Sequence, residues 1–287
     1  MCVPIPVTTV IATRNRCHEL RSSLPRHSGP VILVDNGSTD GTRDMVAREH
    51  PEVTLIPLSR NAGAVARNIG VQEAATPLVA FADDDSWWAP EALERASAVF
   101  ATSPRLAVVN GRILVGEDEV LDPTCDLMAR SPLGTEDGLP GPSILGFVAC
   151  GAVVRRSAFL MAHGFDDVIF FMGEEERLAL DLMELRWHLC YVDSVVAHHH
   201  PSADRDAASR ERRAALAARN QVLTAVLRRP WPEVGRRGLA AAQRGPAGRR
   251  GLGQAAARFP RAVRSRRPVG PAVEMAAKVV ERASDLR

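Results

Sequence analysis

Lysine, aromatic residues and long apolar runs are scarce in this chain of 287 residues. All but one of its 36 basic side chains are arginine, and aromatic residues make up 5% of the sequence. No stretch of about 18 apolar residues occurs, which excludes a membrane-spanning helix. The five cysteines form no Cys-x-x-Cys pair, and residues 1–10 lack a basic region followed by an apolar core. We therefore expect a protein of the reducing cytoplasm.

Several catalytic signatures are also missing. The sequence contains no G-x-x-x-x-G-K-[ST], G-x-S-x-G or H-E-x-x-H, which mark P-loop proteins, α/β-hydrolases and zincins. The composition that is present, 46% hydrophobic and 24% charged, is typical of a globular protein. At roughly 100–200 residues per domain, the length predicts one large α/β domain, or one such domain with an appendage.

The net charge of +2 conceals an uneven distribution. Residues 228–287 carry 15 basic and 4 acidic side chains, whereas residues 1–227 carry 21 basic and 30 acidic ones. The sequence therefore predicts an acidic globular body followed by a basic tail, residues 230–287. The Arg and Ala bias is typical of a GC-rich genome, so arginine counts alone have little functional weight.

Apolar runs alternate with helix-like segments in the first half of the chain. We expect strands at 7–12, 31–34, 53–58 and 78–82, and helices at 17–24, 42–50, 64–74 and 90–102. This alternation predicts a mostly parallel sheet with helices on both faces. In such sheets ligands bind at the carboxyl ends of the strands, where the polar loops of this sequence fall.

The second half is less regular. We expect strands near 106–115, 147–155 and 187–197, helices near 157–163 and 174–186, and a long charged helix over 204–229. The predicted strand at 187–197 leads directly into three histidines.

Three consecutive carboxylates, Asp83, Asp84 and Asp85, directly follow the fourth predicted strand. Adjacent carboxylates repel one another and favour a bound cation, and their oxygens suit Mg²⁺ or Mn²⁺, which commonly bridge carboxylates to phosphates. Alternate side chains of an extended segment point the same way, so Asp83 and Asp85 can share a ligand while Asp84 faces elsewhere. The alternative is a solvated acidic turn.

Two further loops carry candidate binding residues. Asp35 ends the second predicted strand and can accept a hydrogen bond from a ribose hydroxyl or a base, although the turn chemistry of Asn36-Gly37 explains it equally well. Gly63 allows close approach, and Arg67 with the helix amino end attracts a phosphate or a base carbonyl. For Arg67 the alternative is an exposed side chain on an amphipathic helix.

Carboxylates and imidazoles cluster again later in the chain. Glu174, Glu175 and Glu176 begin the helix predicted over 174–186, where they either stabilise the helix dipole or include a general base with a raised pKa. In the run 198–200, a histidine either shares a metal with the aspartates or caps a turn.

Taken in order, these motifs resemble the family 2 glycosyltransferases of GT-A fold. The resemblance covers about residues 5–229 and implies an α/β, Rossmann-like fold with a mostly parallel central sheet flanked by helices and a basic helical C-terminal extension. The similar segments are VIATRNR (10–16), VDNGSTDG (34–41), NAGAVARNIG (61–70), FADDDSW (81–87), GAVVRRSAF (151–159), GFDD (164–167) and GEEERLAL (173–180).

The resemblance also implies a domain organisation. A GT-A domain is expected over residues 1–229, and the basic tail follows over 230–287. Within the domain we expect a nucleotide-sugar half (about 1–110), an acceptor half (about 111–203) and the long helix 204–229.

By this resemblance, the donor is a nucleoside-diphosphate sugar. Thr13 and Asp35 hold its base and ribose, and Arg67 contacts the base or the phosphates. Asp83 lies near the ribose and the metal, and Asp85 binds a divalent cation, Mn²⁺ or Mg²⁺.

The resemblance assigns catalysis to the second half. Glu174-Glu175 stands at the family's usual Glu-Asp pair, so Glu175 occupies the place of the aspartate base. His198 or His200 completes the metal site, and Arg219-Asn220 lies near the diphosphate or the tail. Glu175 then takes a proton from an acceptor hydroxyl, which attacks the anomeric carbon in a single inverting displacement while the metal stabilises the leaving group.

Other functions remain open at this point. Since Glu175 replaces an aspartate, the main alternative is a catalytically degenerate GT-A protein that binds nucleotide sugar or a partner without turnover. A sugar-nucleotide pyrophosphorylase needs catalytic lysines, and the single lysine, Lys278, lies in the tail.

The partners follow from the same resemblance. The acceptor is a glycan, a lipid-linked molecule, a protein or a small molecule, as in cell-envelope or polysaccharide biosynthesis. Few aromatics accompany the arginines of the tail, so we expect no nucleic acid partner. Amphipathic helices at 252–264 and 272–286 predict peripheral contact with the inner face of the cell membrane. The alternative is a partly disordered tail.

Overall fold

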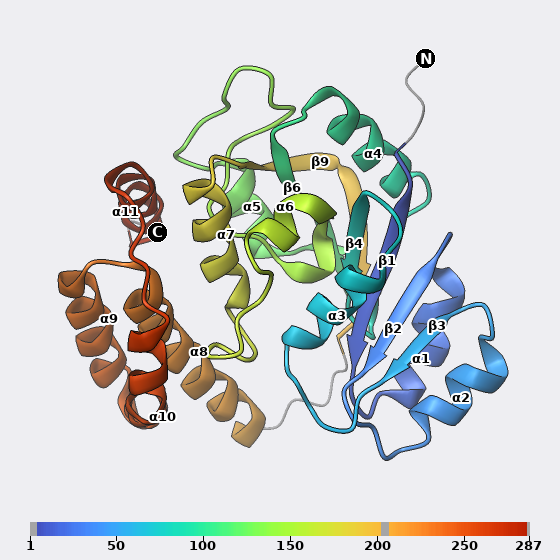
Figure 1. Cartoon of the computed structure of the whole chain (residues 1–287), viewed down its shortest axis with the longest axis horizontal. Coiled ribbons are helices and arrows are strands. Elements are labelled where there is room, and N and C mark those ends of the chain that lie inside the picture. Colours follow the sequence, from blue (N-terminus) through green and yellow to red (C-terminus); the bar gives the residue numbers. More distant parts are fainter. Residues whose placement is uncertain (1–4, 202–206, 286–287) are drawn as a thin grey trace.

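The centre of the molecule is a nine-stranded sheet (Figure 1). The computed structural model describes residues 5–201 and 207–285. The strand order is β3-β2-β1-β4-β8-β6-β9-β5, with β7 beside β6. The strands are β1 (Val7–Thr13), β2 (Val31–Asp35), β3 (Thr54–Pro57), β4 (Leu78–Ala82), β5 (Ser86–Trp88), β6 (Leu106–Val115), β7 (Val120–Leu121), β8 (Ala152–Arg155) and β9 (His188–His199).

Helices cover both faces of this sheet, which confirms the predicted α/β fold. One face packs against α3, α6 and α7, and the other against α1, α2 and α4. Each strand and helix that was predicted in the first half of the chain lies within two residues of its predicted bounds. The helices are α1 (Cys17–Ser23), α2 (Thr42–Glu49), α3 (Val65–Glu73), α4 (Ala92–Thr102), α5 (Pro123–Ala129), α6 (Arg156–Met161), α7 (Glu174–Glu184), α8 (Ala207–Arg228), α9 (Trp231–Gln243), α10 (Gly245–Arg264) and α11 (Pro271–Asp285).

The sheet reverses its strand order at β1. This strand pairs in parallel with β2 on one side and β4 on the other, with Thr13 opposite Asp35 and Ile11 opposite Ala82. The carboxyl ends of these strands therefore meet at one edge of the sheet. A reversal of this kind leaves a crevice outside the strand ends, where α/β proteins bind their ligands.

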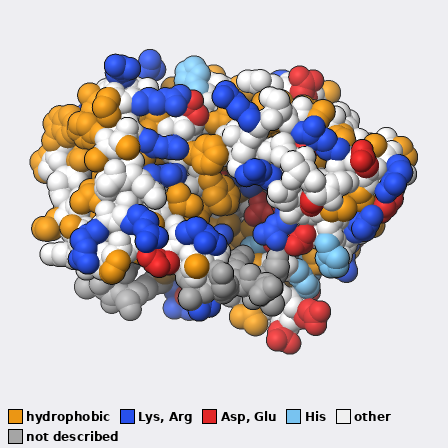
Figure 2. Space-filling model, turned by 90° about the horizontal axis from the view of Figure 1, so that it is seen from below, with side chains coloured by type: hydrophobic (Ala, Val, Ile, Leu, Met, Phe, Trp, Pro, Cys, Tyr) orange, Lys and Arg blue, Asp and Glu red, His pale blue; other side chains and the backbone are white. Residues whose placement is uncertain are grey.

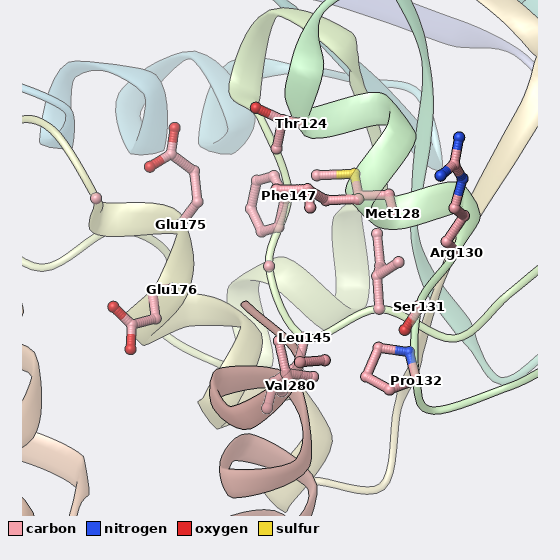
Figure 3. A pocket seen from close by; sticks show the side chains of 15 residues that line it. Thr124, Met128, Arg130, Ser131, Pro132, Leu145, Phe147, Glu175, Glu176 and Val280 are labelled. Atoms are coloured by element: carbon pink, nitrogen blue, oxygen red, sulfur yellow. The ribbon is translucent and has the colours of Figure 1, made fainter. Parts of the chain in front are cut away.

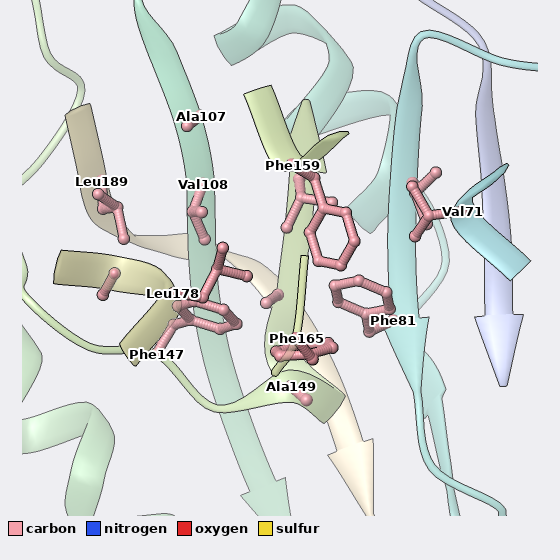
Figure 4. Packing of buried hydrophobic residues seen from close by; sticks show 14 of the residues in the cluster. Val71, Phe81, Ala107, Val108, Phe147, Ala149, Phe159, Phe165, Leu178 and Leu189 are labelled. Carbon is pink, nitrogen blue, oxygen red and sulfur yellow. The ribbon is translucent and has the colours of Figure 1, made fainter. Parts of the chain in front are cut away.

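An aromatic cluster fixes the helices near this edge. Phe81 of β4 packs against Phe159 of α6 and Phe165, with ring centroids 5.6 and 5.7 Å apart, and Leu178 of α7 lies buried in the same core (Figure 4). Aromatic pairs of this kind contribute about 0.5–1.5 kcal/mol each beyond burial. The amino end of α7 is thereby held in place relative to the end of β4.

Three parts of the middle region differ from the prediction. The strand expected over 147–155 begins only at Ala152, because the Val148 N–H donates to Asn110 Oδ1 at 2.7 Å and residues 149–151 form a 3-10 turn. The short strand β5 follows the three aspartates and pairs with β9, and α5 precedes the long loop. Neither was predicted, since β5 depends on a partner more than 100 residues away.

Residues beyond Pro230 fold onto the rest of the protein as three helices. In Figure 1 these helices gather on the side of α7 and α8. Gly251 of α10 lies so close to α8 that an added Cβ would stand 2.4 Å from the Ala215 carbonyl oxygen. Small residues thus allow close helix packing, and the alternative of a partly disordered tail is wrong for the described residues. Residues 204–206 of the predicted long helix and 286–287 of the tail lie outside them.

Ion pairs between body and tail offset part of their charge imbalance. Arg237 binds Glu176 at 2.7 Å, Arg261 pairs with Asp167, and Arg250 lies 3.3 Å from Glu211. None of the described helices is both long and apolar enough to cross a bilayer. Part of the apolar surface of α10 and α11 also packs against α8 and α7. The expected membrane contact through the tail therefore finds no support.

Candidate active site

A cavity of about 310 Å³ lies at the carboxyl ends of β1 and β4, in the crevice that the sheet reversal creates. Figure 2 looks onto this end of the molecule, where arginine side chains gather around a central hollow. Thr13 and Arg67 line this cavity, as does the whole aspartate cluster. The other polar and aromatic lining residues are Arg14, Arg16, Asn36, Asn61, Phe170, Phe171, His199 and Arg213.

The side chains of the three aspartates point in two different directions. Asp83 accepts a hydrogen bond from Arg67 at 2.5 Å, and Asp85 Oδ1 lies 3.4 Å from His199 Nε2. Asp84 instead accepts from the Thr13 hydroxyl at 3.0 Å. Burial and the two neighbouring carboxylates raise the pKa of Asp84 to about 7. Asp84 thus faces away from the other two as expected, but because of a turn, in which the Ser86 N–H donates to the Asp83 carbonyl at 3.2 Å, and not because the segment is extended.

The group around Asp83 has the composition of a cation site. Ligand atoms of Asp83, Cys150 and His199 all lie within 4.8 Å of one another, and Asp85 adjoins His199. Burial raises the pKa of the Cys150 thiol well above its usual range, so this thiol stays protonated at neutral pH. Carboxylates with one imidazole suit a hard or borderline divalent ion, so these residues fit such a cation.

The structure brings His199, rather than His198 or His200, to the carboxylates. Successive side chains of β9 point to opposite faces, and His198 and His200 both lie against Trp87, with ring centroids 5.5 and 4.6 Å away. His198 Nδ1 also lies 3.1 Å from Glu119 Oε1. Because all three residues are histidine, the sequence does not show which face of β9 meets the aspartates. The pairing of β9 with β5 decides this.

Asp35 does not line the cavity. Its carboxylate is fully buried and accepts a hydrogen bond from Arg43 Nε at 2.5 Å and from a backbone N–H three residues ahead. Turn chemistry thus explains Asp35. Asn36 lines the cavity in its place, and its side chain ties the loop to Gly63 and Ala62 through bonds of 3.2 and 3.0 Å.

Gly63 makes a close contact within the protein itself. Its φ is +61°, and an added Cβ would lie 2.3 Å from the Phe170 carbonyl oxygen. The Ala64 N–H donates to this same oxygen at 2.6 Å. The close approach that glycine permits here therefore joins the start of α3 to the loop before α7.

Arg219 and Asn220 of α8 position that loop from its other side. Arg219 donates to the Ile169 carbonyl at 2.9 Å, and Asn220 donates to the carbonyls of Phe171 and Met172 at 2.6 and 2.5 Å. The loop carries two phenylalanines of the cavity wall and leads into α7. Both α8 residues thus act on the cavity through the loop.

Glu174 and Glu175 stand at the amino end of α7. Glu174 is 2% exposed, and one of its oxygens lies 3.6 Å from Arg67. Burial raises the pKa of both carboxyls, the Glu175 charge raises that of Glu174 further, and Arg67 opposes both shifts. The Glu175 carboxylate points away from that of Glu176 (Figure 3). Two carboxylates with raised pKa values beside an arginine are typical of a catalytic site.

Glu174→Gln is expected to stabilise the protein at alkaline pH. Because folding raises the Glu174 pKa, protonation stabilises the folded state fully below the unfolded value of about 4.3, and this contribution is lost as the pH rises through the folded value. Glutamine imitates the protonated form at every pH. Thermal unfolding should therefore show a gain of a few degrees near pH 9 and none near pH 4.

The matched control is Glu184→Gln at the exposed far end of α7, which should show no such gain. Loss of stability in Glu174→Gln at both pH values would instead mean that the ionised carboxylate stabilises the fold through Arg67.

An open α/β sheet with an acidic, arginine-lined crevice at its reversal agrees with the expected GT-A fold. Comparison with known proteins agrees. The model of the family described as "Glycosyl transferase family 2" matches residues 10–160, more than half of the chain. The protein belongs to this family and is a glycosyltransferase.

Curated relatives include an N-acetylglucosaminyl-diphospho-decaprenol L-rhamnosyltransferase of Mycobacterium tuberculosis. It is 29% identical over 214 residues, which span 62% of this chain and 69% of that protein. A putative teichuronic acid biosynthesis glycosyltransferase, TuaG of Bacillus subtilis, is 39% identical over 69 residues, covering 23% of this chain and 27% of the relative.

Solved structures share the fold. The mannosyltransferase PcManGT from Pyrobaculum calidifontis, in complex with GDP-Man and Mn²⁺, has a TM-score of 0.59 at 20% identity over 96% of this chain and 87% of that one. S. aureus TarS 1–349 in complex with UDP-GlcNAc has a TM-score of 0.58 at 14% identity over 98% and 92%. At these identities the likeness supports the GT-A architecture alone.

Proposed function

We propose that this glycosyltransferase moves a sugar from a nucleoside-diphosphate donor to an acceptor hydroxyl in one inverting displacement, with Glu175 as the general base. The observation that carries the proposal is the position of Glu175. It lies within electrostatic reach of Arg67 and Asp83 in the donor crevice, yet lines a separate pocket on the other side of α7. A base between two pockets can serve a donor in one and an acceptor in the other.

The crevice supplies the groups that a nucleoside diphosphate needs. Thr13 and Asn36 offer hydrogen bonds at the ends of β1 and β2, and Arg213 of α8 adds a positive charge from the opposite wall. Arg67 is held between Asp83 and Glu174, so its guanidinium is oriented before a ligand arrives. The buried Asp35 carboxylate stabilises the loop after β2, which carries Asn36.

Asp83, Asp85 and His199 are the proposed ligands of a divalent cation, Mn²⁺ or Mg²⁺. Bound there, such an ion neutralises charge on the leaving diphosphate as a Lewis acid. The Mn²⁺ in the similar mannosyltransferase structure is consistent with this assignment. Cys150, which is protonated and buried, lies on the inner side of these proposed ligands.

Glu175 performs the proton transfer. Burial raises its pKa, which strengthens it as a base while leaving it ionised at sufficiently high pH. The acceptor hydroxyl donates its proton to this carboxylate as the oxygen bonds to the anomeric carbon and the bond to the diphosphate breaks. A single displacement from one face inverts the anomeric configuration.

These positions suggest a role for each part of the chain. Residues 1–229 form the proposed catalytic domain, and the names of the relatives support a role in building polysaccharide or cell-envelope glycans. Of the helices after Pro230, α11 borders the pocket beyond Glu175 and thus belongs to the acceptor side.

The donor assignment is tested by thermal unfolding with UDP, GDP, dTDP or CMP, each with Mn²⁺ or Mg²⁺ and again with EDTA. A ligand at about 100 times its Kd adds about 2.7 kcal/mol to the folded state, which raises Tm by several degrees. One nucleotide should produce this shift, and EDTA should remove it. A protein that no nucleotide stabilises in the presence of metal would contradict the proposal and favour the degenerate alternative.

A further inference from the structure

A second cavity of about 310 Å³ opens beside Glu175, on the side of α7 away from the donor crevice. Its walls come from four parts of the chain: α5 with the residues that follow it, the segment 144–147, the amino end of α7, and α11 near the C-terminus (Figure 3). Most of the lining is apolar, and the large apolar side chains are Leu127, Met128, Ile144, Leu145, Phe147 and Val280.

The polar groups of this cavity lie around the apolar walls. Thr124, Ser131 and Arg130 stand on the side of α5, and Glu175 and Glu176 stand on the side of α7 (Figure 3). Arg237 already binds Glu176 at 2.7 Å. Glu175 is therefore the acidic group at which a hydroxyl can be activated, next to a mostly apolar surface.

We propose that this cavity receives the hydrocarbon part of an amphiphilic acceptor whose hydroxyl group lies at Glu175. The inference rests on the proposed function, because it takes Glu175 as the base. A sugar ring placed against these walls would lose hydrogen bonds to water without replacement, whereas a hydrocarbon gains by leaving water. The size of the cavity is that of a small-molecule site.

The C-terminal helix α11 completes this cavity. Val280 lies on α11, far along the chain from α5, and α11 is held by a buried network in which Arg229 binds Glu274 at 2.6 Å and Glu281 at 2.7 Å. Leu180 of α7 packs against the same helix. The extension therefore acts as an acceptor-specificity element that leaves the donor crevice untouched.

The test uses the full chain and the series methyl, butyl, hexyl and octyl β-D-glucopyranoside, each below its micelle concentration. Ligand-observed NMR measures the dissociation constants. Because one buried methylene contributes up to about fourfold in affinity, binding should tighten steadily with chain length until the cavity is filled. Equal affinity for methyl and octyl glucoside would overturn the proposal.

Matched variants test whether the alkyl chain binds in this cavity. Leu127 in the cavity and Leu121 on β7 are 43% and 40% exposed, so Leu127→Asp and Leu121→Asp place the same charge at equally accessible positions. Only Leu127→Asp should remove the dependence on chain length. Val280→Asp and its exposed neighbour Val279→Asp repeat the comparison on the opposite wall. If the control variants lose the dependence as well, the alkyl chain binds elsewhere and the proposal is wrong.

Two further readouts separate the possible failures. Nucleotide-dependent stabilisation, measured on the same samples, should persist in Leu127→Asp; its absence from the wild type would refute the proposed function itself. Sedimentation with and without octyl glucoside tests whether the cavity is instead covered by a second copy of the chain. A dimer that octyl glucoside dissociates, without chain-length dependence of binding, would overturn the acceptor assignment.

Discussion

Replacing Glu175 by Gln is expected to lower kcat by about 10²–10⁴-fold, the contribution typical of a positioned general base. Glutamine has nearly the same shape but cannot take the acceptor proton. Glu175 is not among the residues that line the donor crevice, so donor binding should survive. Steady-state transfer rates and nucleotide-dependent stabilisation, measured on the same preparation, check the two halves of this prediction.

Glu184→Gln provides the control, because it makes the same change at the exposed end of the same helix. It should transfer sugar at the wild-type rate. Glu175→Asp keeps the carboxylate but shortens its reach, so a partial loss is expected there. Full activity in Glu175→Gln would remove this residue from the mechanism and leave Glu174 as the remaining carboxylate of the pair.

The pH dependence should carry the signature of a buried base. Glu175 acts only when ionised, and burial raises its pKa. Activity is therefore lost on acidification at a higher pH than for an exposed glutamate, whose pKa is about 4.3. A profile of kcat/KM against pH measures this acid limb. An inflection at the ordinary glutamate value would contradict the buried environment of the carboxylate.

Asp85→Ala is expected to remove metal-dependent donor binding and to lower transfer by about 10³-fold or more, because metal ions contribute several kcal/mol to stabilising developing charge. Asp85 lies beside His199 in the candidate cation site. The nucleotide-dependent rise in Tm should disappear in this variant, as it does with EDTA. Asp137→Ala, an exposed carboxylate in the loop before β8, should leave both properties unchanged.

Three single histidine variants sharpen the same prediction. His199→Ala should weaken metal-dependent stabilisation strongly, whereas His198→Ala and His200→Ala should retain it, because their rings lie against Trp87. Loss of metal dependence in His198→Ala or His200→Ala alone would return the metal ligand to the residues that the family resemblance suggested.

Much of the donor side of this site can be read from local patterns. Thr13 and the three aspartates end apolar strands, and strand ends of a parallel sheet meet at one edge. Their convergence needs only the alternation of strands and helices, which is encoded over short stretches of sequence. Arg67 could be placed for the same reason, since α3 follows β3, a parallel strand of the same sheet.

The contacts that each side chain or glycine makes were not accessible in this way. Asp35 sits in a strand-end motif like that of Asp83, yet Arg43 and a turn N–H enclose its carboxylate. The glycine at position 63 has a typical loop signal, but its neighbour is the Phe170 carbonyl. In each case the deciding contact comes from a residue whose direction depends on how the chain folds back.

The sequence by itself determined the α/β class, the family and the set of acidic, basic and imidazole groups available for chemistry, because these depend on residue type and short-range periodicity. The tertiary structure alone decided that His199 faces the aspartates, that α8 holds the loop before α7, and that α11 forms a wall beside Glu175. The physical reason is that strand pairing and helix packing set which way a side chain points, and both join residues that no local pattern relates.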